Sequence, residues 1–411
     1  MNAVGIDISK GKSMVAVLRP LGEVVAKPFE VVHTAAELKK LAHFLQSLDG
    51  ETKVVMEHTG RYYEPVAQVI HEQGLFVSAV NPLLIREYGG NSLRRVKTDK
   101  ADAKKIARYG LDNWAELREY TPMDEIRYEL KTLNRQFHLA SKNRTACSNN
   151  LIALLDQSFP GARSWFTSPV REDGNQKWVD FAMTFWHVDC VRSLSCAAFT
   201  ERYRMWCKRN RYIFGAAKAE QIHSESREMI ALVSKSATTK LLIQQAASQL
   251  LSVSRTVEVL RAEMNRLAAL LPEYSVVMSM YGVGESLGPQ LMAEIGDIRR
   301  FAGKQSLVAF AGVDPMPNQS GAKEVRSNKS SKRGSPYLRK TLFNITTVLL
   351  QKAPPDQPVY QFLDRKRAEG KPFYVYMTAG ANKFLRIYFG KVRDHLATLN
   401  ASTNDTPAAN P

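Results

Sequence analysis

Four acidic residues near the N-terminus have the type and spacing of a divalent-metal site. They are Asp7, Glu57, Asp99 and Asp102. Asp7 and Glu57 each end an apolar run, whereas Asp99 and Asp102 are three residues apart and project from one face if that segment is helical. Carboxylate oxygens from several elements suit Mg²⁺, with Mn²⁺ as a substitute. Two such ions can hold the attacking and leaving oxygens of a phosphoryl transfer.

The alternative for Asp99 and Asp102 is a solvated helix surface, because runs of mixed charge are usually exposed. Asp7 and Glu57 argue against it, since an acid that ends a buried strand is costly unless a cation meets it. Taken together, the four acids favour a metal site.

The composition indicates a polyanionic partner. The 411 residues include 57 Lys plus Arg and 40 Asp plus Glu, which gives a net charge of +17. The sequence shows no signal peptide, basic amphipathic anchor or long uncharged apolar stretch, so we expect no membrane partner and a cytoplasmic, nucleoid-associated protein. Four irregularly spaced cysteines predict free thiols.

The elements that must position the acids form a predicted α/β domain over residues 1–115. Strands are expected at 2–8, 13–18 and 23–32, and a capping box at Thr34 and Glu37 opens a helix. The strand with Glu57, a helix over 64–73, a strand over 75–80 and the helix with Asp99 and Asp102 follow. Three hairpin strands and then alternating helix and strand are typical of the ribonuclease H-like (RuvC-like) fold.

Two heptad-like runs predict a coiled-coil region over residues 116–271. Apolar residues recur from Ile126 to Leu154 and, more regularly, from Ile243 to Leu271. The seam lies either between the two runs or between subunits of a homo-oligomer, a dimer or a pair of dimers. A single long core helix is the alternative.

An aromatic-rich insertion, at about 159–215, separates the two runs. His187, Cys190, Cys196 and Cys207 lie within it, but their intervals match no common zinc pattern. We therefore predict a small apolar core that contains buried thiols. Basic residues beside the aromatics leave nucleic-acid contact open as an alternative.

The remaining residues predict a mostly helical C-terminal domain over 272–396 and a disordered tail over 397–411. Gly282 and Gly284 suit a helix-hairpin-helix whose amides contact a phosphate; a plain glycine turn is the alternative. A basic loop then leads to a helix opened by Ser335 and Pro336. The predicted nucleic-acid contacts are Arg94, Arg95, Lys97, Gly282, Gly284, Lys323, Arg326, Lys329, Lys332, Arg333, Arg339 and Lys340.

Motifs at both ends of the chain resemble one family. Glu-His-Thr-Gly and Lys-Thr-Asp-Lys-Ala-Asp stand near the N-terminus; Gly-Val-Gly, Phe-Ala-Gly-Val-Asp-Pro, Gln-Ser-Gly and Ser-Lys-Arg-Gly-Ser-Pro-Tyr-Leu-Arg-Lys follow the second heptad run. They look like those of the DEDD-type transposases of bacterial insertion sequences, a group that includes the pilin-gene invertase and the bridge-RNA-guided recombinases. The resemblance covers all of the chain except the insertion and the tail.

The resemblance implies a RuvC-like domain, a coiled coil and a transposase domain with a nucleophilic serine. By motif match this serine is Ser320, although many relatives carry two serines and two glycines where this chain has Gln319 and Ala322. Ser327, Ser330 and Ser331 are nearby rivals. DNA, a noncoding guide RNA and a site shared between subunits are implied as well. A metal-dependent nuclease or junction resolvase that uses water, and a non-catalytic nucleic-acid-binding scaffold, are the alternatives.

Overall fold

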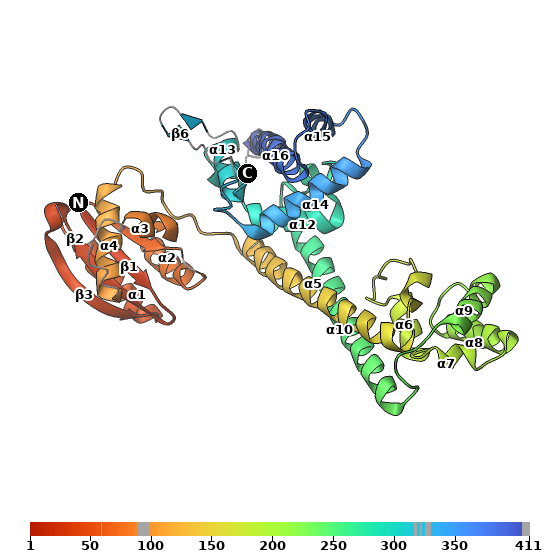
Figure 1. The fold of residues 1–411 in the computed structure, drawn as a ribbon. Coiled ribbons are helices and arrows are strands. Elements are labelled where there is room, and N and C mark those ends of the chain that lie inside the picture. The colour runs from red at the N-terminus through yellow and green to blue at the C-terminus, as the bar shows by residue number, and fades with distance from the viewer. Residues whose placement is uncertain (59, 89–97, 316–318, 321–322, 325–329, 405–411) are drawn as a thin grey trace, which may run out of the picture. The chain divides into compact units, whose positions relative to one another are not determined.

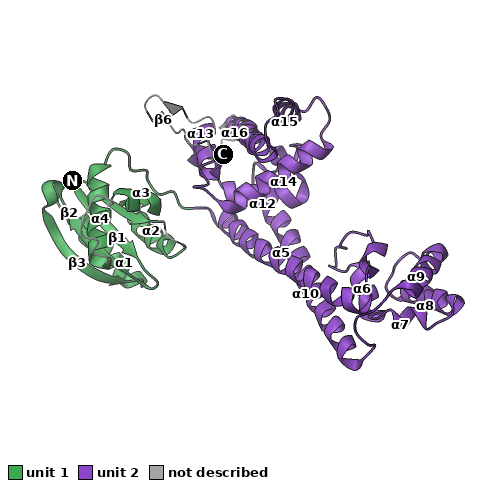
Figure 2. Ribbon diagram, in the orientation of Figure 1, with its two compact units in different colours: residues 1–122 green, residues 123–411 purple. Residues whose placement is uncertain are grey.

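The computed structural model describes residues 1–58, 60–88, 98–315, 319–320, 323–324 and 330–404. The chain divides into two units, Met1–Pro122 and Met123–Pro411 (Figure 2). The first unit extends past the predicted boundary at residue 115, because the chain returns to the sheet there: the Tyr120 amide donates to the Val77 carbonyl at 2.6 Å.

The first unit is built on a five-stranded sheet in the order β3-β2-β1-β4-β5. β2 runs antiparallel to β1 and β3, whereas β4 is parallel to β1 and β5 is parallel to β4. The strands agree with the predicted ones, and the assignment to the RuvC-like fold stays a prediction. Their bounds are β1 (Asn2–Ile8), β2 (Lys12–Leu18), β3 (Val24–Val32), β4 (Thr52–Glu57) and β5 (Phe76–Val80), with a short helix η1 (Pro20–Gly22).

Helices cover both faces of this sheet (Figure 1). α1 (Ala35–Gln46) and α2 (Tyr63–Glu72) bury the face that carries Ile6 and Met56. α3 (Pro82–Tyr88) and α4 (Asp99–Asp112) cover the opposite face, where Val55 packs with Ile106. The predicted cap of α1 is confirmed, since the Thr34 hydroxyl accepts from the Glu37 amide at 3.3 Å.

Two long helices form the centre of the second unit. α5 (Glu125–Ser158) and α10 (Ala237–Ala268) lie side by side (Figure 1). They are antiparallel, because Arg127 pairs with Glu273 at one end whereas Arg144 pairs with Glu258 further along. Many of the heptad residues, such as Leu130, Leu250 and Met264, are buried within the chain, which favours a seam between the two runs. Coiled-coil geometry and self-association stay predictions.

The insertion between α5 and α10 spans residues 159–236, so the predicted end at 215 is too early. It contains η2 (Ala162–Trp165), α6 (Lys177–Thr184), α7 (Asp189–Arg192), α8 (Cys196–Arg209) and α9 (Ala216–Glu228). The predicted aromatic core is confirmed, because Phe159, Phe181, Phe185 and Tyr203 are fully buried. The chain enters and leaves this module at one place: the Gln157 carbonyl accepts from the amides of Leu232 and Val233.

The four cysteines are free, as predicted. Cys190 and Cys207 are buried, but Cys196 is exposed, so the prediction of buried thiols is wrong for that residue. His187 is engaged by the backbone: its Nδ1 accepts from the Asp189 amide at 3.1 Å, and its Nε2 faces the Val233 carbonyl at 3.0 Å. This use of both ring nitrogens leaves none for zinc.

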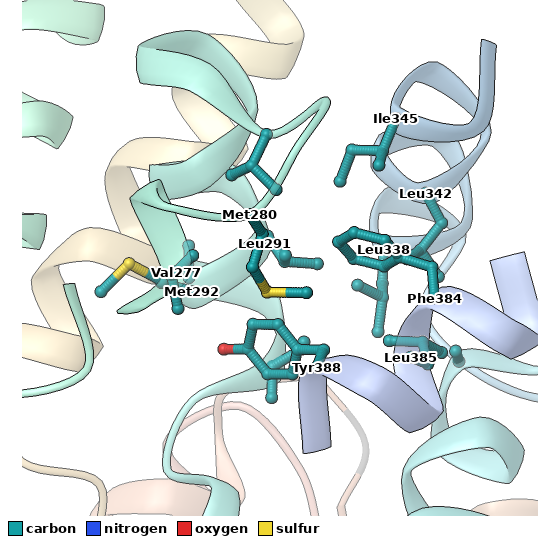
Figure 3. Close-up of a cluster of buried hydrophobic side chains, with 14 of the residues drawn as sticks. Val277, Met280, Leu291, Met292, Leu338, Leu342, Ile345, Phe384, Leu385 and Tyr388 are labelled. Atoms are coloured by element: carbon teal, nitrogen blue, oxygen red, sulfur yellow. The ribbon is translucent and has the colours of Figure 1, made fainter. Parts of the chain in front are cut away.

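The C-terminal part of the second unit is helical. Its elements are α11 (Tyr274–Met278), α12 (Gly284–Ile295), η3 (Ile298–Arg300), α13 (Lys304–Ala311), β6 (Gln319–Ser320), β7 (Lys323–Glu324), α14 (Pro336–Lys352), α15 (Pro358–Ala368) and α16 (Phe373–Asn404). Side chains of α11, α12, α14 and α16 meet in one apolar core (Figure 3). α16 continues to Asn404, so the predicted tail from 397 begins too early; residues 405–411 lie outside the described part.

Within the described residues, no helix combines the length and the apolarity needed to cross a bilayer.

Candidate active site

The four predicted acids belong to three neighbouring elements of the first unit. Asp7 is near the end of β1 and Glu57 ends β4. Because Ile6 pairs with Met56 in parallel register, the next residues of the two strands, Asp7 and Glu57, are adjacent. Asp99 and Asp102 occupy the first turn of α4, whose N-cap is Thr98; its hydroxyl accepts from the Ala101 amide at 3.3 Å.

A glycine lets α4 lie directly on β1. A Cβ at Gly5 would lie 2.1 Å from the Ala103 carbonyl oxygen and 2.3 Å from the Ala107 amide nitrogen. Asp7, two residues after Gly5, projects from the same face of the strand. Further along, a Cβ at Gly110 would lie 3.5 Å from Ala3. The helix therefore runs antiparallel to β1, and its first turn, with Asp99 and Asp102, lies over the end of the strand that carries Asp7.

The acids repel one another. Partial burial raises the pKa of the Asp7 carboxyl to about 6, and the negative charges of Asp102, Asp99 and Glu57 act in the same direction. Lys12, a cation whose own pKa is raised chiefly by Glu30 and also by Asp99, is already paired with Glu30 at 2.7 Å. The cluster therefore gathers negative charge on one face of the sheet.

The donor set fits a hard cation, because the site gathers carboxylates from β1, β4 and α4. In the described residues, no three Asp, Glu, His or Cys side chains are arranged to hold a metal ion together. The acids are close enough to interact electrostatically but not to ligate one ion, and Asp99 is exposed. Side-chain rotation of the acids would be needed to complete a coordination shell.

Ser320 lies in a short hairpin of the second unit. β6 pairs antiparallel with β7, with Ser320 opposite Lys323. Only the backbone of these strands is described, so the side chains of Ser320 and Lys323 are outside the description. Ser327 lies outside the described residues.

The base of this serine loop is closed by backbone and side-chain bonds. Pro315 and Ser330 form an antiparallel bridge, and the Ser331 amide donates to the Asp314 carbonyl at 3.0 Å. The Ser331 hydroxyl also donates to Asp314 Oδ1 at 2.5 Å. Of the rival serines, Ser331 is therefore engaged in holding the loop. Lys332 adopts a left-handed φ of 53° and donates its amide to the Gly312 carbonyl.

Gly312, Gly334 and Arg339 pack tightly at the same base. A Cβ at Gly334 would lie 1.8 Å from the Phe310 carbonyl oxygen, so only glycine fits there. Arg339 Nη1 donates to the carbonyls of Gly334 at 2.8 Å and Ala311 at 3.2 Å. Burial lowers the pKa of Arg339. This predicted phosphate ligand thus bonds to the protein backbone through at least one of its nitrogens.

A buried carboxylate that the sequence analysis did not single out joins the loop to α5. Glu294 on α12 is 3 % exposed and accepts from Asn134 Nδ2 at 2.7 Å. Its other oxygen accepts from Arg135 at 3.1 Å and from the hydroxyl of Ser335, the N-cap of α14, at 2.6 Å. A buried acid is stabilised by several such donors. Nothing in the local sequence distinguishes Glu294 from a surface glutamate, since its partners are distant in the chain.

His138 is the second missed residue. It comes from α5, outside the predicted C-terminal domain, and its ring lies 5.0 Å from that of Tyr337, centroid to centroid. Burial, with smaller effects from Lys340 and Arg135, lowers the pKa of His138 to about 4. A neutral imidazole therefore packs beside the helix that follows the serine loop.

The other predicted nucleic-acid contacts remain predictions. Lys332, Arg333 and Lys340 are exposed. Gly282 packs on α14, where a Cβ would lie 3.3 Å from the Ile345 carbonyl, which favours the glycine-turn interpretation. Gly284 is exposed with open space around it. Five predicted contacts lie outside the described residues: Arg94, Arg95, Lys97, Arg326 and Lys329.

An acidic cluster at the end of a sheet, together with a serine hairpin on a helical unit, has the features of a nucleic-acid-processing protein. Residues 4–160 match the family model of DEDD transposases of IS110, described as "Transposase", and residues 274–361 match the one described as "Transposase IS116/IS110/IS902 family". The chain therefore belongs to the IS110/IS116 family of insertion-sequence transposases.

Individual relatives agree with this family. The chain is 29% identical over 168 residues to an uncharacterized 42 kDa protein of insertion element IS900 of Mycobacterium paratuberculosis, a match that covers 39% of this chain and 41% of that protein. It is 22% identical to the pilin gene-inverting protein of Moraxella bovis, over 83% of this chain and 80% of that one. An uncharacterized IS116 protein of Streptomyces clavuligerus is 21% identical over 95% and 94% of the two chains.

Proposed function

We propose that this protein is a DNA transposase, a site-specific recombinase that cuts and rejoins the DNA of an insertion sequence. The observation that carries the proposal is the convergence of Asp7, Glu57, Asp99 and Asp102 on the face of the sheet under α4. The raised pKa of Asp7 supports it, because perturbed carboxyls gather at functional sites. Membership in a transposase family gives the reaction class.

Asp7, Glu57, Asp99 and Asp102 would hold Mg²⁺ or Mn²⁺, which supplies charge stabilisation for phosphoryl transfer. The four acids would reach the ion from two directions. Asp7 and Glu57 present oxygens from neighbouring strand ends, and the α4 acids approach from above. Because Asp7 titrates near pH 6, it is mostly ionised, and able to bind a cation, above that pH.

Ser320 is the proposed nucleophile, on the family resemblance. Its oxygen forms a bond to a DNA phosphorus while the bond from that phosphorus to a deoxyribose oxygen breaks. The serine loses its proton and the departing deoxyribose oxygen gains one. The phosphoserine ester conserves the energy of the broken bond, so a DNA hydroxyl can rejoin the strand by the reverse step without ATP.

The family resemblance also implies a noncoding bridge RNA as guide and a homo-oligomer in which one subunit supplies the acids and another supplies the serine. We include both in the proposal, together with localisation of the protein to the bacterial nucleoid. The net charge of +17 supports nucleic-acid partners in general but does not distinguish DNA from RNA.

Single-substitution variants test the chemistry. Ser320→Ala and Asp7→Asn should each bind nucleic acid with nearly wild-type affinity, yet lose strand cleavage by about 10³-fold or more, since each removes a group that acts in the transition state. The wild type should form a denaturation-resistant protein–DNA adduct in Mg²⁺ but not in excess chelator. Mass spectrometry should map the adduct to the peptide with Ser320.

A mixture of the two inactive variants tests the shared site. If the acids and the serine act in trans, a mixed oligomer contains one intact site, and adduct formation should return to a fraction of the wild-type level. If Ser320→Ala still cleaved DNA rapidly and formed no adduct, the protein would be a nuclease that uses water as its nucleophile and not a serine recombinase. Binding without cleavage under any metal condition would leave only the scaffold function.

A further inference from the structure

The insertion module carries a hollow lined by cations and no acid. It encloses about 340 Å³ where α6, α7, α8 and α10 meet. The lining residues are Met183, Thr184, Trp186, Cys190, Ser193, Arg202, Lys235, Lys240 and Gln244. Three of them are basic. Thr184, Ser193 and Gln244 are polar, and each already donates to a backbone carbonyl.

The three cations have no carboxylate partner among the described residues. Lys235 Nζ lies 3.5 Å from a backbone carbonyl, that of Asp189, and the Arg202 guanidinium lies 5.6 Å from the Phe185 ring centroid. Neither contact neutralises charge. By contrast, Arg204, two residues away on α8, is paired with Glu201 at 2.7 Å. The hollow thus gathers three cations that form no ion pair within the described residues.

Independent features point in the same direction. Burial raises the pKa of the Cys190 thiol; Lys235 and Arg202 oppose this effect and the Asp189 carboxylate adds to it, so two of the three cations act on this wall of the hollow. Lys235 and Lys240 flank the start of α10, whose N-cap Ser236 accepts from the Thr239 amide at 3.1 Å. The positive end of this 32-residue helix adds to the field of the lysines.

We propose that this hollow is a phosphate-binding site for the backbone of a nucleic-acid strand, distinct from the carboxylate cluster and the serine loop. Arg202 presents planar donors to phosphate oxygens, whereas Lys235 and Lys240 act as point charges. Trp186, which is 9 % exposed, offers little ring surface for stacking a base, so the site binds backbone and not sequence. The inference rests on the proposed function for its ligand class.

The site gives the insertion a role that the family models do not describe, because residues 161–273 lie between the two matches. A module at the far end of the α5–α10 pair from the C-terminal core would hold a strand at a second point, so that the strand is positioned as well as cut (Figure 1).

Salt dependence of binding provides the test. The full-length variant Arg202→Gln/Lys235→Gln/Lys240→Gln is compared with wild type and with Arg204→Gln, a control on the same helix whose charge is already paired. Affinity for a labelled DNA duplex and for an RNA hairpin is measured between about 50 and 200 mM salt. Each lost phosphate contact should flatten the slope of log affinity against log salt by about 0.9 for duplex DNA.

We expect the triple variant to lose about two to three such contacts and Arg204→Gln to lose none. If the slope changes with DNA alone, the pocket binds the DNA of the element or its target. If it changes with RNA alone, the pocket binds the guide RNA, and if it changes with both, the pocket binds nucleic-acid backbone in general. Deuterium exchange of residues 183–196 should slow on binding in wild type only, and circular dichroism should show that the variant is folded. An unchanged slope and exchange pattern would overturn the site.

The proposed function and the pocket can fail separately. If wild type binds no nucleic acid, the proposed function fails. If wild type binds and forms the serine adduct while the triple variant keeps its slope, only the pocket is rejected. Excess inorganic phosphate could also return the deuterium exchange of residues 183–196 to the rate of the unbound wild type while the strand stays bound. The hollow would then bind a free anion, and the strand-binding site would be rejected.

Discussion

His138 is expected to make the second unit sensitive to acid. Burial lowers its pKa to about 4 from the ordinary 6.5, so the folded chain holds it neutral while the unfolded chain protonates it at higher pH. Stability is therefore complete above about pH 6.5 and falls as the pH drops toward 4. The loss is at most about 1.4 kcal/mol per pH unit in that window.

Replacement by an aromatic residue should remove this effect. His138→Phe keeps the packing on Tyr337 but cannot titrate, so its free energy of unfolding should change less between pH 7 and pH 5 than that of wild type. His395→Gln, at a partly exposed histidine of α16, is the control and should follow wild type. Parallel pH profiles for His138→Phe and wild type would contradict the assignment.

At the scale of residues, a functional group can be predicted from the sequence where its neighbours along the chain mark it. Asp7 and Glu57 stand after apolar runs, which is unusual for acids. Glu294 and His138 escaped notice because their environment is made by residues about 160 and 200 positions away, such as Asn134 and Tyr337. Long-range burial leaves no local signal in one sequence.

The contact between α4 and β1 gives a prediction at the scale of elements. Gly5→Ala places a Cβ 2.1 Å from the backbone of α4, which cannot move aside without shifting the helix, so the first unit should lose about 1–3 kcal/mol of stability. Displacement of α4 also carries Asp99 and Asp102 away from Asp7. The pKa of Asp7, measured by NMR titration, should then fall from about 6 toward 3.8.

Gly110→Ala, on the α4 side of the same contact, is the matched control. Its new Cβ would meet a side-chain atom, Val55 Cγ2 at 2.9 Å, and no backbone atom within 3.4 Å, and alanine favours the helix by about 1 kcal/mol. We expect near-neutral stability and an unchanged pKa of Asp7. If both variants behaved alike, the close approach at Gly5 would not be what positions the acids.

Elements were predictable where periodicity is strong. The five strands and the long helices follow from alternation and heptad spacing. The end of the insertion was not predictable in this way, because α9 (Ala216–Glu228) is polar along most of its length. It is held by tertiary contacts such as that of His223 with the Leu194 carbonyl. The helical end of the chain was missed because the Ser, Thr and Asn residues within 398–404 do not favour a helix on their own.

At the scale of the molecule, the first unit should fold alone. Its two apolar clusters contain only residues of 1–122. A fragment of residues 1–122 should therefore melt cooperatively, as followed by circular dichroism. A fragment of residues 1–115 should melt several degrees lower, because it lacks Tyr120, which contacts the rings of Tyr63 and His71 and bonds to β5. An unfolded 1–122 fragment would show that this unit depends on the rest of the chain.

Self-association cannot use the heptad residues that are already buried within the chain. Met264 and Leu267, for example, lie in the C-terminal core. A charge at Leu267 should unfold that core instead of separating subunits. Sedimentation of Val259→Asp, at an exposed position of α10, therefore reports more directly on a subunit contact along this helix.

The bonds from Leu232 and Val233 to Gln157 make the insertion a side branch of the chain. Since the path out of α5 and the path back to α10 meet at one carbonyl, a short turn could close the gap that the module now fills. A gene could then gain, lose or exchange this module in a single event, with the register of the two helices preserved. The fold thus allows the insertion to change while the α5–α10 pair and the C-terminal core stay the same.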